Sequence, residues 1–164
     1  MAGLDFDPIE RAGELWEERV GPADAMRLAT SLMRVQQLVS SELDAAVRPF
    51  SITFARYEVL RLLSFSRRGS LPLSIIGERL MVHPTSVTNA IDRLVAQDLV
   101  DRTTDPTDRR RVLASLTPEG ERVLERATAA VTAIDFAVGA LSVEDQRATY
   151  HLLRALRGVD VPIR

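Results

Sequence analysis

Two adjoining stretches decide the fold: LSIIGERLMVHPTSVTNAIDRLVAQDLVDR at residues 73–102 and TTDPTDRRRVLASLTPEGERVL at residues 103–124. In the first, Ser74 is predicted to cap a short helix over residues 75–80. A second helix is predicted over residues 84–97, because it opens on a proline, which suits a first helical turn. We therefore expect two short helices joined by a tight turn.

The second stretch is typical of a β-hairpin. Residues 99–104 and 111–117 are expected to form its strands, and the Asp- and Pro-rich sequence DPTDRR at 105–110 its turn. RRGS at 67–70, upstream of both helices, is read as another turn. Two short helices followed by a ribbon with a charged tip predict a winged helix-turn-helix, so the expected fold class is mainly α with a small β-hairpin (α+β).

The helix over residues 84–97 has two chemically different faces. Apolar residues at helical spacing are expected to be buried: Val87, Ile91, Leu94 and Val95. The other face carries small hydrogen-bonding groups and an arginine: Thr85, Ser86, Thr88, Asn89 and Arg93. A helix of about 14 residues is roughly 21 Å long and fits the major groove of DNA. The hairpin adds Arg109, Arg110 and Arg111, which the potential of a narrow minor groove attracts.

A plainer interpretation stays open for both features. Hydroxyl groups on an exposed helix face and arginines in a turn are usually only solvated. Residues 83–111 also carry five arginines and five aspartates, and Asp108 could serve to orient Arg110. The alternative function is therefore a winged-helix protein-interaction module without sequence-specific DNA binding.

The flanking segments are predicted to be helical. Helices are expected over residues 8–20, 24–47, 54–65, 118–139 and 143–157, with Thr53, Thr117 and Ser142 as caps of the last three. Their apolar stripes exceed what a winged helix can cover, which favours pairing with a second copy of the chain. The expected organisation is an N-terminal extension helix (1–21), a helical dimerisation region (22–49 and 118–164) and a DNA-binding domain (50–117).

Composition excludes several classes of protein. The 164 residues are 46% hydrophobic and 27% charged, with a net charge of −2, no cysteine and two histidines. Thiol chemistry is thus excluded, and neither a metal site, a cofactor nor an enzyme is expected. With no apolar run of about 20 residues and an acidic start, we expect no membrane association and a cytoplasmic location.

The quoted stretches, together with ITFARYEVLRLL at 52–63, resemble the MarR family of transcriptional regulators over residues 24–157. The shared features are the TNAIDRL helix, the DPTDRR wing and the LTPEG helix start. The resemblance implies a homodimeric repressor that binds a pseudo-palindromic double-stranded operator and is relieved by a small phenolic or carboxylic effector. It assigns DNA contacts to Thr85, Ser86, Thr88, Asn89, Arg93, Asp108 and Arg110. This chain departs from the family at Met81, where glycine is usual, and at His83, where serine is usual.

Candidate effector residues come from a partial similarity to the urate-responsive branch of that family. By position, Trp16, Glu58 and Arg102 match three of its four ligand residues, whereas Ala90 replaces the second arginine. Tyr57 and Arg34 are further candidates to line a cavity. The alternatives are a packing role for Trp16, a core role for Tyr57 and a surface role for Arg34.

Overall fold

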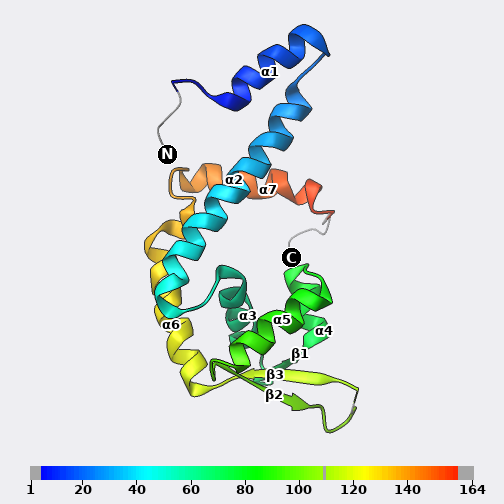
Figure 1. The fold of residues 1–164 in the computed structure, drawn as a ribbon, viewed down its shortest axis with the longest axis vertical. Helices are drawn as coiled ribbons and strands as arrows, with labels where there is room; N and C mark the ends of the chain where they lie inside the picture. The colour runs from blue at the N-terminus through cyan, green and yellow to red at the C-terminus, as the bar shows by residue number, and fades with distance from the viewer. Residues whose placement is uncertain (1–4, 109, 159–164) are drawn as a thin grey trace. The chain divides into compact units, whose positions relative to one another are not determined.

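The computed structural model describes residues 5–108 and 110–158 (Figure 1). In chain order the elements are α1 (Pro8–Arg19), α2 (Asp24–Val47), the 3₁₀ turn η1 (Arg48–Phe50), α3 (Phe54–Ser64), β1 (Ser70–Pro72), α4 (Leu73–Leu80), α5 (Pro84–Val95), β2 (Val100–Thr104), β3 (Val112–Leu116), α6 (Pro118–Ala133), the 3₁₀ turn η2 (Asp135–Ala137) and α7 (Val143–Leu156). They divide into two compact units, Met1–Glu42 and Leu43–Arg164.

In the first unit, Arg27 fastens α1 to the start of α2. Its guanidinium donates to Glu17 Oε1 at 2.5 Å and to Glu10 Oε1 at 3.0 Å. The side chain passes directly over Gly13, where a Cβ atom would lie 2.2 Å from Arg27 Nε. Glycine at this position therefore lets the arginine reach both acids.

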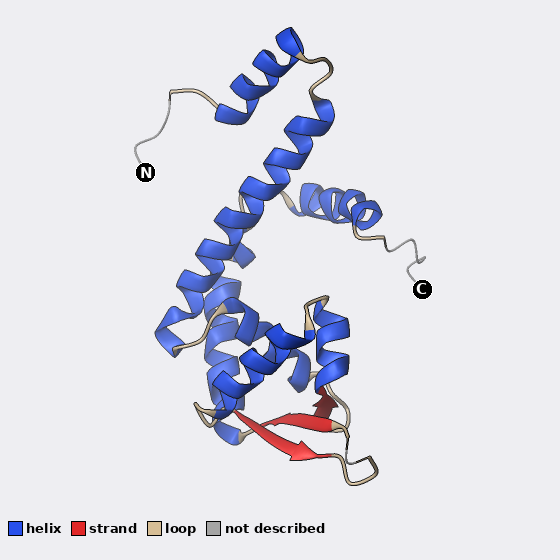
Figure 2. Ribbon diagram, turned by 45° about the vertical axis from the view of Figure 1, so that its right-hand side comes forward, coloured by secondary structure: helices blue, strands red, loops and turns tan. Residues whose placement is uncertain are grey.

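The second unit contains the winged helix. Its antiparallel sheet has the order β1-β3-β2, with Ala114 paired to Leu71 on one side and to Arg102 on the other (Figure 2). Helices α3, α4 and α5 contact one another and the sheet, and their fully buried side chains form the core: Leu60, Leu63, Ile76, Val87, Ile91 and Leu94. The expected fold, a mainly helical winged helix-turn-helix with a small sheet, is confirmed.

Two details at the start of the helix-turn-helix differ from expectation. Residue Ser70 begins strand β1 rather than ending a turn, and that strand leads directly into α4. Because Pro72 is extended and serves as the N-cap, α4 begins at Leu73. The prediction that Ser74 caps this helix is therefore wrong.

The predicted helix over residues 118–139 is also wrong at its end. Helix α6 stops at Ala133, and three successive residues, Asp135, Phe136 and Ala137, have φ values of 49°, 51° and 59°. An L-residue in this left-handed region costs roughly 1–2 kcal/mol, so local preference does not favour this bend.

The ends of the β-ribbon are joined to the start of α6 by hydrogen bonds of Thr117. Thr117 caps α6 as predicted, because its Oγ1 accepts from the Gly120 N–H at 2.9 Å. The same hydroxyl donates to the Asp98 carbonyl at 2.6 Å, and the Thr117 N–H donates to the Leu99 carbonyl at 3.2 Å. A Cβ atom at Gly120 would lie 2.0 Å from the Leu99 oxygen, so only glycine lets α6 and the ribbon approach this closely.

Candidate nucleic-acid interface

Helix α5 is held by its apolar face and presents its polar face to solvent. Val87 is 2% exposed, and Ile91 and Leu94 are fully buried against the rest of the core. On the opposite side lie the exposed candidates Thr85, Ser86, Asn89 and Arg93, whereas Thr88 is half-buried. The Thr88 hydroxyl donates to the Pro84 carbonyl at 3.2 Å, so Thr88 also supports the first turn of its own helix.

The turn before α5 accommodates both departures from the family pattern. Met81 adopts the left-handed conformation (φ 56°, ψ 40°), where a glycine would carry no Cβ penalty. His83 replaces a serine cap by accepting from the Thr85 N–H through Nδ1 at 3.3 Å. The turn therefore forms with both residues in place, at a cost in backbone strain at Met81.

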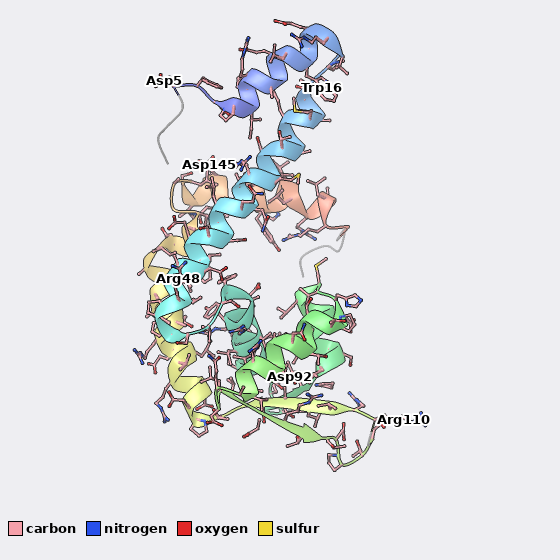
Figure 3. All side chains as sticks on the ribbon, in the orientation of Figure 1. Asp5, Trp16, Arg48, Asp92, Arg110 and Asp145 are labelled. Atoms are coloured by element: carbon pink, nitrogen blue, oxygen red, sulfur yellow. The ribbon has the colours of Figure 1, made fainter. Side chains whose placement is uncertain are left out.

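An ion pair connects α5 to the ribbon. Arg102 on β2 donates from Nη1 to Asp92 Oδ1 at 2.7 Å. Figure 3 shows Asp92 on α5 just above the sheet. Arg102, a candidate effector residue, is thus already paired within the winged helix.

The wing turn is ordered by aspartates. Asp105 Oδ1 accepts from the Thr107 N–H at 2.8 Å and from the Thr107 hydroxyl at 2.6 Å. Together with Arg111 nearby, these donors hold the pKa of the Asp105 carboxyl below its usual value. Asp108 Oδ1 accepts from the backbone N–H of Arg110 at 3.0 Å, so Asp108 orients the main chain at Arg110.

The three wing arginines have different positions. Arg110 lies exposed at the tip and points away from the body of the winged helix (Figure 3). Arg111 instead turns toward Asp105, with Nη1 3.9 Å from Oδ2. Arg109 lies outside the described residues.

The candidate effector residues in the second unit do not all face solvent. Tyr57 is 4% exposed and belongs to the core, where its hydroxyl accepts from the Thr128 hydroxyl at 3.4 Å. Glu58 lies on the exposed side of α3, and partial desolvation of its carboxyl raises its pKa. In the first unit, Trp16 is 42% exposed, and Arg34 Nη1 donates to Gln37 Oε1 at 2.8 Å on the surface of α2.

One hollow beside α5 contains residues that sequence reasoning missed. About 550 Å³ in volume, it lies between the start of α3 and the middle of α5 and is lined by Thr53, Ala55, Arg56, Asn89, Ala90, Asp92 and Arg93. Arg56 supplies a second guanidinium beside Ala90. Its sequence position in another helix gave no sign that it would lie near Arg93.

Neither a metal centre nor a membrane span is found in the described part of the chain. No group of three or more potential metal-ligating side chains comes together within residues 5–108 and 110–158. Within the same residues, no helix combines the length and apolarity needed to cross a bilayer.

The winged helix and its flanking helices are similar to those of known regulators. The MarR family model matches residues 52–112. A curated repressor, Rv2887 of Mycobacterium tuberculosis, is 30% identical over 84% of this chain and 98% of its own length. Two curated relatives from Bacillus subtilis have higher identity to this chain, but the matched region covers only 54% and 66% of their own lengths.

Solved structures give the same assignment. The MarR family regulator Sco5413 of Streptomyces coelicolor is 50% identical, with a TM-score of 0.76 over 81% of this chain and 92% of that one. Sco3205 from the same organism, solved in complex with DNA, is 26% identical with a TM-score of 0.76 over 85% of this chain and 89% of that one. Near-complete alignment with Rv2887 and Sco5413 confirms the resemblance: the chain belongs to the MarR family of transcriptional regulators.

Proposed function

We propose that this protein is a homodimeric repressor that binds operator DNA with α5 in the major groove and the wing in the minor groove. The observation that carries the proposal is the division of α5 into a buried apolar face and an exposed polar face. Its buried face anchors it to the core while Thr85, Ser86, Asn89 and Arg93 remain exposed. With 12 residues, the helix is about 18 Å long, which suits the major groove.

Side chains on α5 and the wing have complementary tasks in this proposal. Asn89 can form two hydrogen bonds to an adenine edge, and Arg93 can form two to guanine or pair with a phosphate. Thr85 and Ser86 lie at the helix start, where free backbone N–H groups favour phosphate. Arg110 at the exposed tip is suited to the minor groove.

Exposed apolar residues at the end of the chain support dimerisation. Around the end of α6 and along α7, Val138, Leu141, Val143, Tyr150, Leu152 and Leu156 are each at least 36% exposed. The first unit likewise exposes Leu28, Met33, Val35 and Leu38 on α2. Large apolar side chains exposed on each of these helices favour an interface with a second copy of the chain. In a two-fold dimer, recognition helices about 34 Å apart would match one turn of DNA.

A small phenolic or carboxylic effector is the proposed signal, and the hollow between α3 and α5 is its proposed site. Arg56 and Arg93 offer two guanidinium groups to an anionic ligand there, beside the Asn89 amide. A ligand paired with Arg93 would withdraw that residue from DNA. The repressor role is inferred from Rv2887, which is named a transcriptional repressor.

The test is footprinting of the purified protein across the DNA upstream of its own coding sequence, with a salt series. The proposal predicts a protected pseudo-palindrome and an affinity that falls steeply with salt, because neutralised phosphates release counterions. Protection elsewhere in the genome would support operator binding while removing autoregulation. No preference for any site over random DNA would contradict the proposal and favour the protein-interaction module.

A further inference from the structure

A second hollow lies on the winged helix, away from the proposed effector site. It is about 720 Å³ in volume and is bordered by the α3–β1 loop, β1, α4 and the base of the wing. Ligand sites for small molecules commonly have volumes of about 300–1,000 Å³. The size of this hollow is therefore suited to a small molecule.

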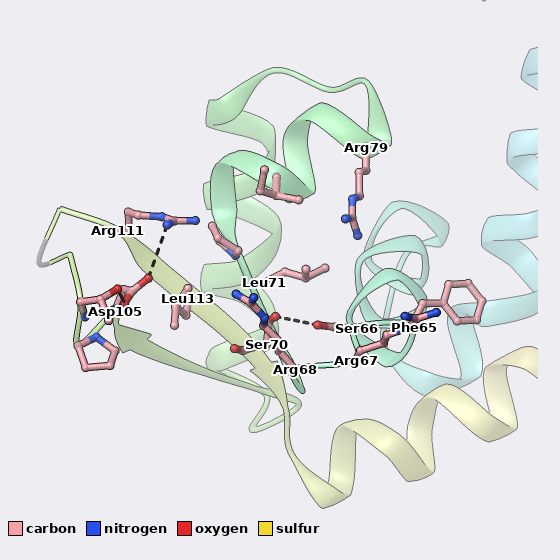
Figure 4. Close-up of a pocket in the computed structure, with 14 residues that line it drawn as sticks. Phe65, Ser66, Arg67, Arg68, Ser70, Leu71, Arg79, Asp105, Arg111 and Leu113 are labelled. Carbon is pink, nitrogen blue, oxygen red and sulfur yellow. Dashed lines mark hydrogen bonds and ion pairs between the residues drawn. The ribbon is translucent and has the colours of Figure 1, made fainter. Parts of the chain in front are cut away.

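Four arginines surround the hollow against a single acid. Arg67 and Arg68 come from the α3–β1 loop, Arg79 from α4 and Arg111 from the wing, and the acid is Asp105. Figure 4 shows Arg79 on α4, Arg67 and Arg68 near the α3–β1 loop, and Arg111 on the wing side beside Asp105. The lining thus carries a formal charge of +3, four guanidinium groups less one carboxylate.

Most of this positive charge is uncompensated. Asp105 is already occupied by the two Thr107 donors and by Arg111, whose nearest nitrogen is 3.9 Å away. Within the described residues, Arg67, Arg68 and Arg79 have no ion pair or hydrogen bond through their side chains. Cations gathered in one concave surface repel each other, and an anion bound there would relieve that repulsion.

Part of the lining is apolar. Leu71, Ile75 and Leu113 belong to it, and Leu71 is 8% exposed. Apolar side chains together with guanidinium groups favour a ligand with an organic body and charged ends. Arginine forks bind phosphate and carboxylate groups through paired hydrogen bonds.

We propose that this hollow binds a small organic polyanion carrying at least two phosphate or carboxylate groups, at a site separate from the α3–α5 hollow. Arg68, Arg79 and Arg111 hold the anionic groups, and the apolar lining residues contact the organic body. Binding would place negative charge beside the wing and so weaken its attraction to DNA. This last consequence rests on the proposed DNA binding, whereas the site itself does not.

The test is calorimetric titration of the full-length protein, without DNA, with inorganic pyrophosphate and with ADP as probes. Sodium chloride at matched ionic strength serves as the reference. The proposal predicts saturable binding of one probe molecule per chain. The double variant Arg68→Ala/Arg79→Ala should bind at least about tenfold more weakly. Arg122→Ala, which removes an exposed arginine on α6 outside the hollow, should bind as the wild type does.

Three results would overturn the proposal. The first is the absence of saturable binding, and the second is equal binding by the double variant and the wild type. The third concerns the salt dependence of DNA binding, which the double variant should leave unchanged. A salt slope reduced by about two would show that these arginines contact DNA phosphates instead. Because both variants replace exposed side chains, far-UV circular dichroism suffices to confirm that the fold is retained.

Discussion

The contact between α6 and the β-ribbon predicts that Gly120→Ala destabilises the protein strongly. The added Cβ atom would lie 2.0 Å from the Leu99 carbonyl oxygen and 3.0 Å from its carbon. Both atoms belong to the main chain, so no side-chain rotation can relieve the overlap. Either α6 or the end of the ribbon must move.

The expected loss of unfolding free energy is about 3 kcal/mol. Overpacking a tight contact costs roughly 1–3 kcal/mol. Gly120→Ala should lie at the upper end of this range, because the contact is between the backbones of α6 and Leu99, which adjust less easily than side chains. Moving Leu99 also weakens the hydrogen bond from the Thr117 N–H, worth about 1 kcal/mol. Alanine regains at most about 1 kcal/mol through its higher helix propensity.

Urea unfolding followed by far-UV circular dichroism measures this difference, at one fixed protein concentration because dimerisation would contribute to stability. The control is Glu121→Ala, which truncates an exposed side chain on the same turn of α6 and should cost less than about 1 kcal/mol. If Gly120→Ala were as stable as the wild type, or more stable as helix propensity alone requires, the close approach of α6 to Leu99 would be refuted.

Three further predictions concern the turn, the wing and the N-terminal helix. Met81→Gly should raise the unfolding free energy by about 1 kcal/mol by removing left-handed strain, whereas Met81→Ala should give no such gain; chemical denaturation compares them. The pKa of the Asp105 carboxyl should be below that of an unfolded-state aspartate in an NMR titration. The stabilisation of the wing by the ionised Asp105 carboxylate is then complete above the unfolded-state pKa and is lost as pH falls through the lowered pKa of the folded state. An unshifted titration would refute the Thr107 contacts. Gly13→Ala should displace the Arg27 guanidinium and speed hydrogen exchange in α1 while changing overall stability by less than about 1 kcal/mol, since exposed ion pairs contribute little; unchanged exchange would count against the contact.

Sequence patterns predicted the winged helix because its signals are local. Caps at Thr53, Thr117 and Ser142 depend on a side chain reaching an N–H group three residues ahead. The polar face of α5 follows from helical periodicity. Each of these features involves residues close in sequence, so the pattern alone specified them.

The features that were missed depend on tertiary contacts. Strand β1 has three residues, too few for an alternating pattern, and it exists because β3 pairs with it. Helix α6 ends at residues with left-handed backbone conformations, and none of them is a glycine or proline that would have predicted the break. The arginine-lined hollow gathers arginines from positions 67 to 111, and only folding brings them together.

The salt dependence of operator affinity in wild type and Arg110→Ala tests the central claim most directly. If the exposed wing arginine contacts DNA, the variant should bind more weakly, and the slope of log affinity against log salt should be smaller by about one. Arg122→Ala on α6 serves as the matched control and should leave affinity and slope unchanged. An Arg110→Ala variant with the affinity and slope of the wild type would contradict the account of the wing as part of the DNA-binding surface.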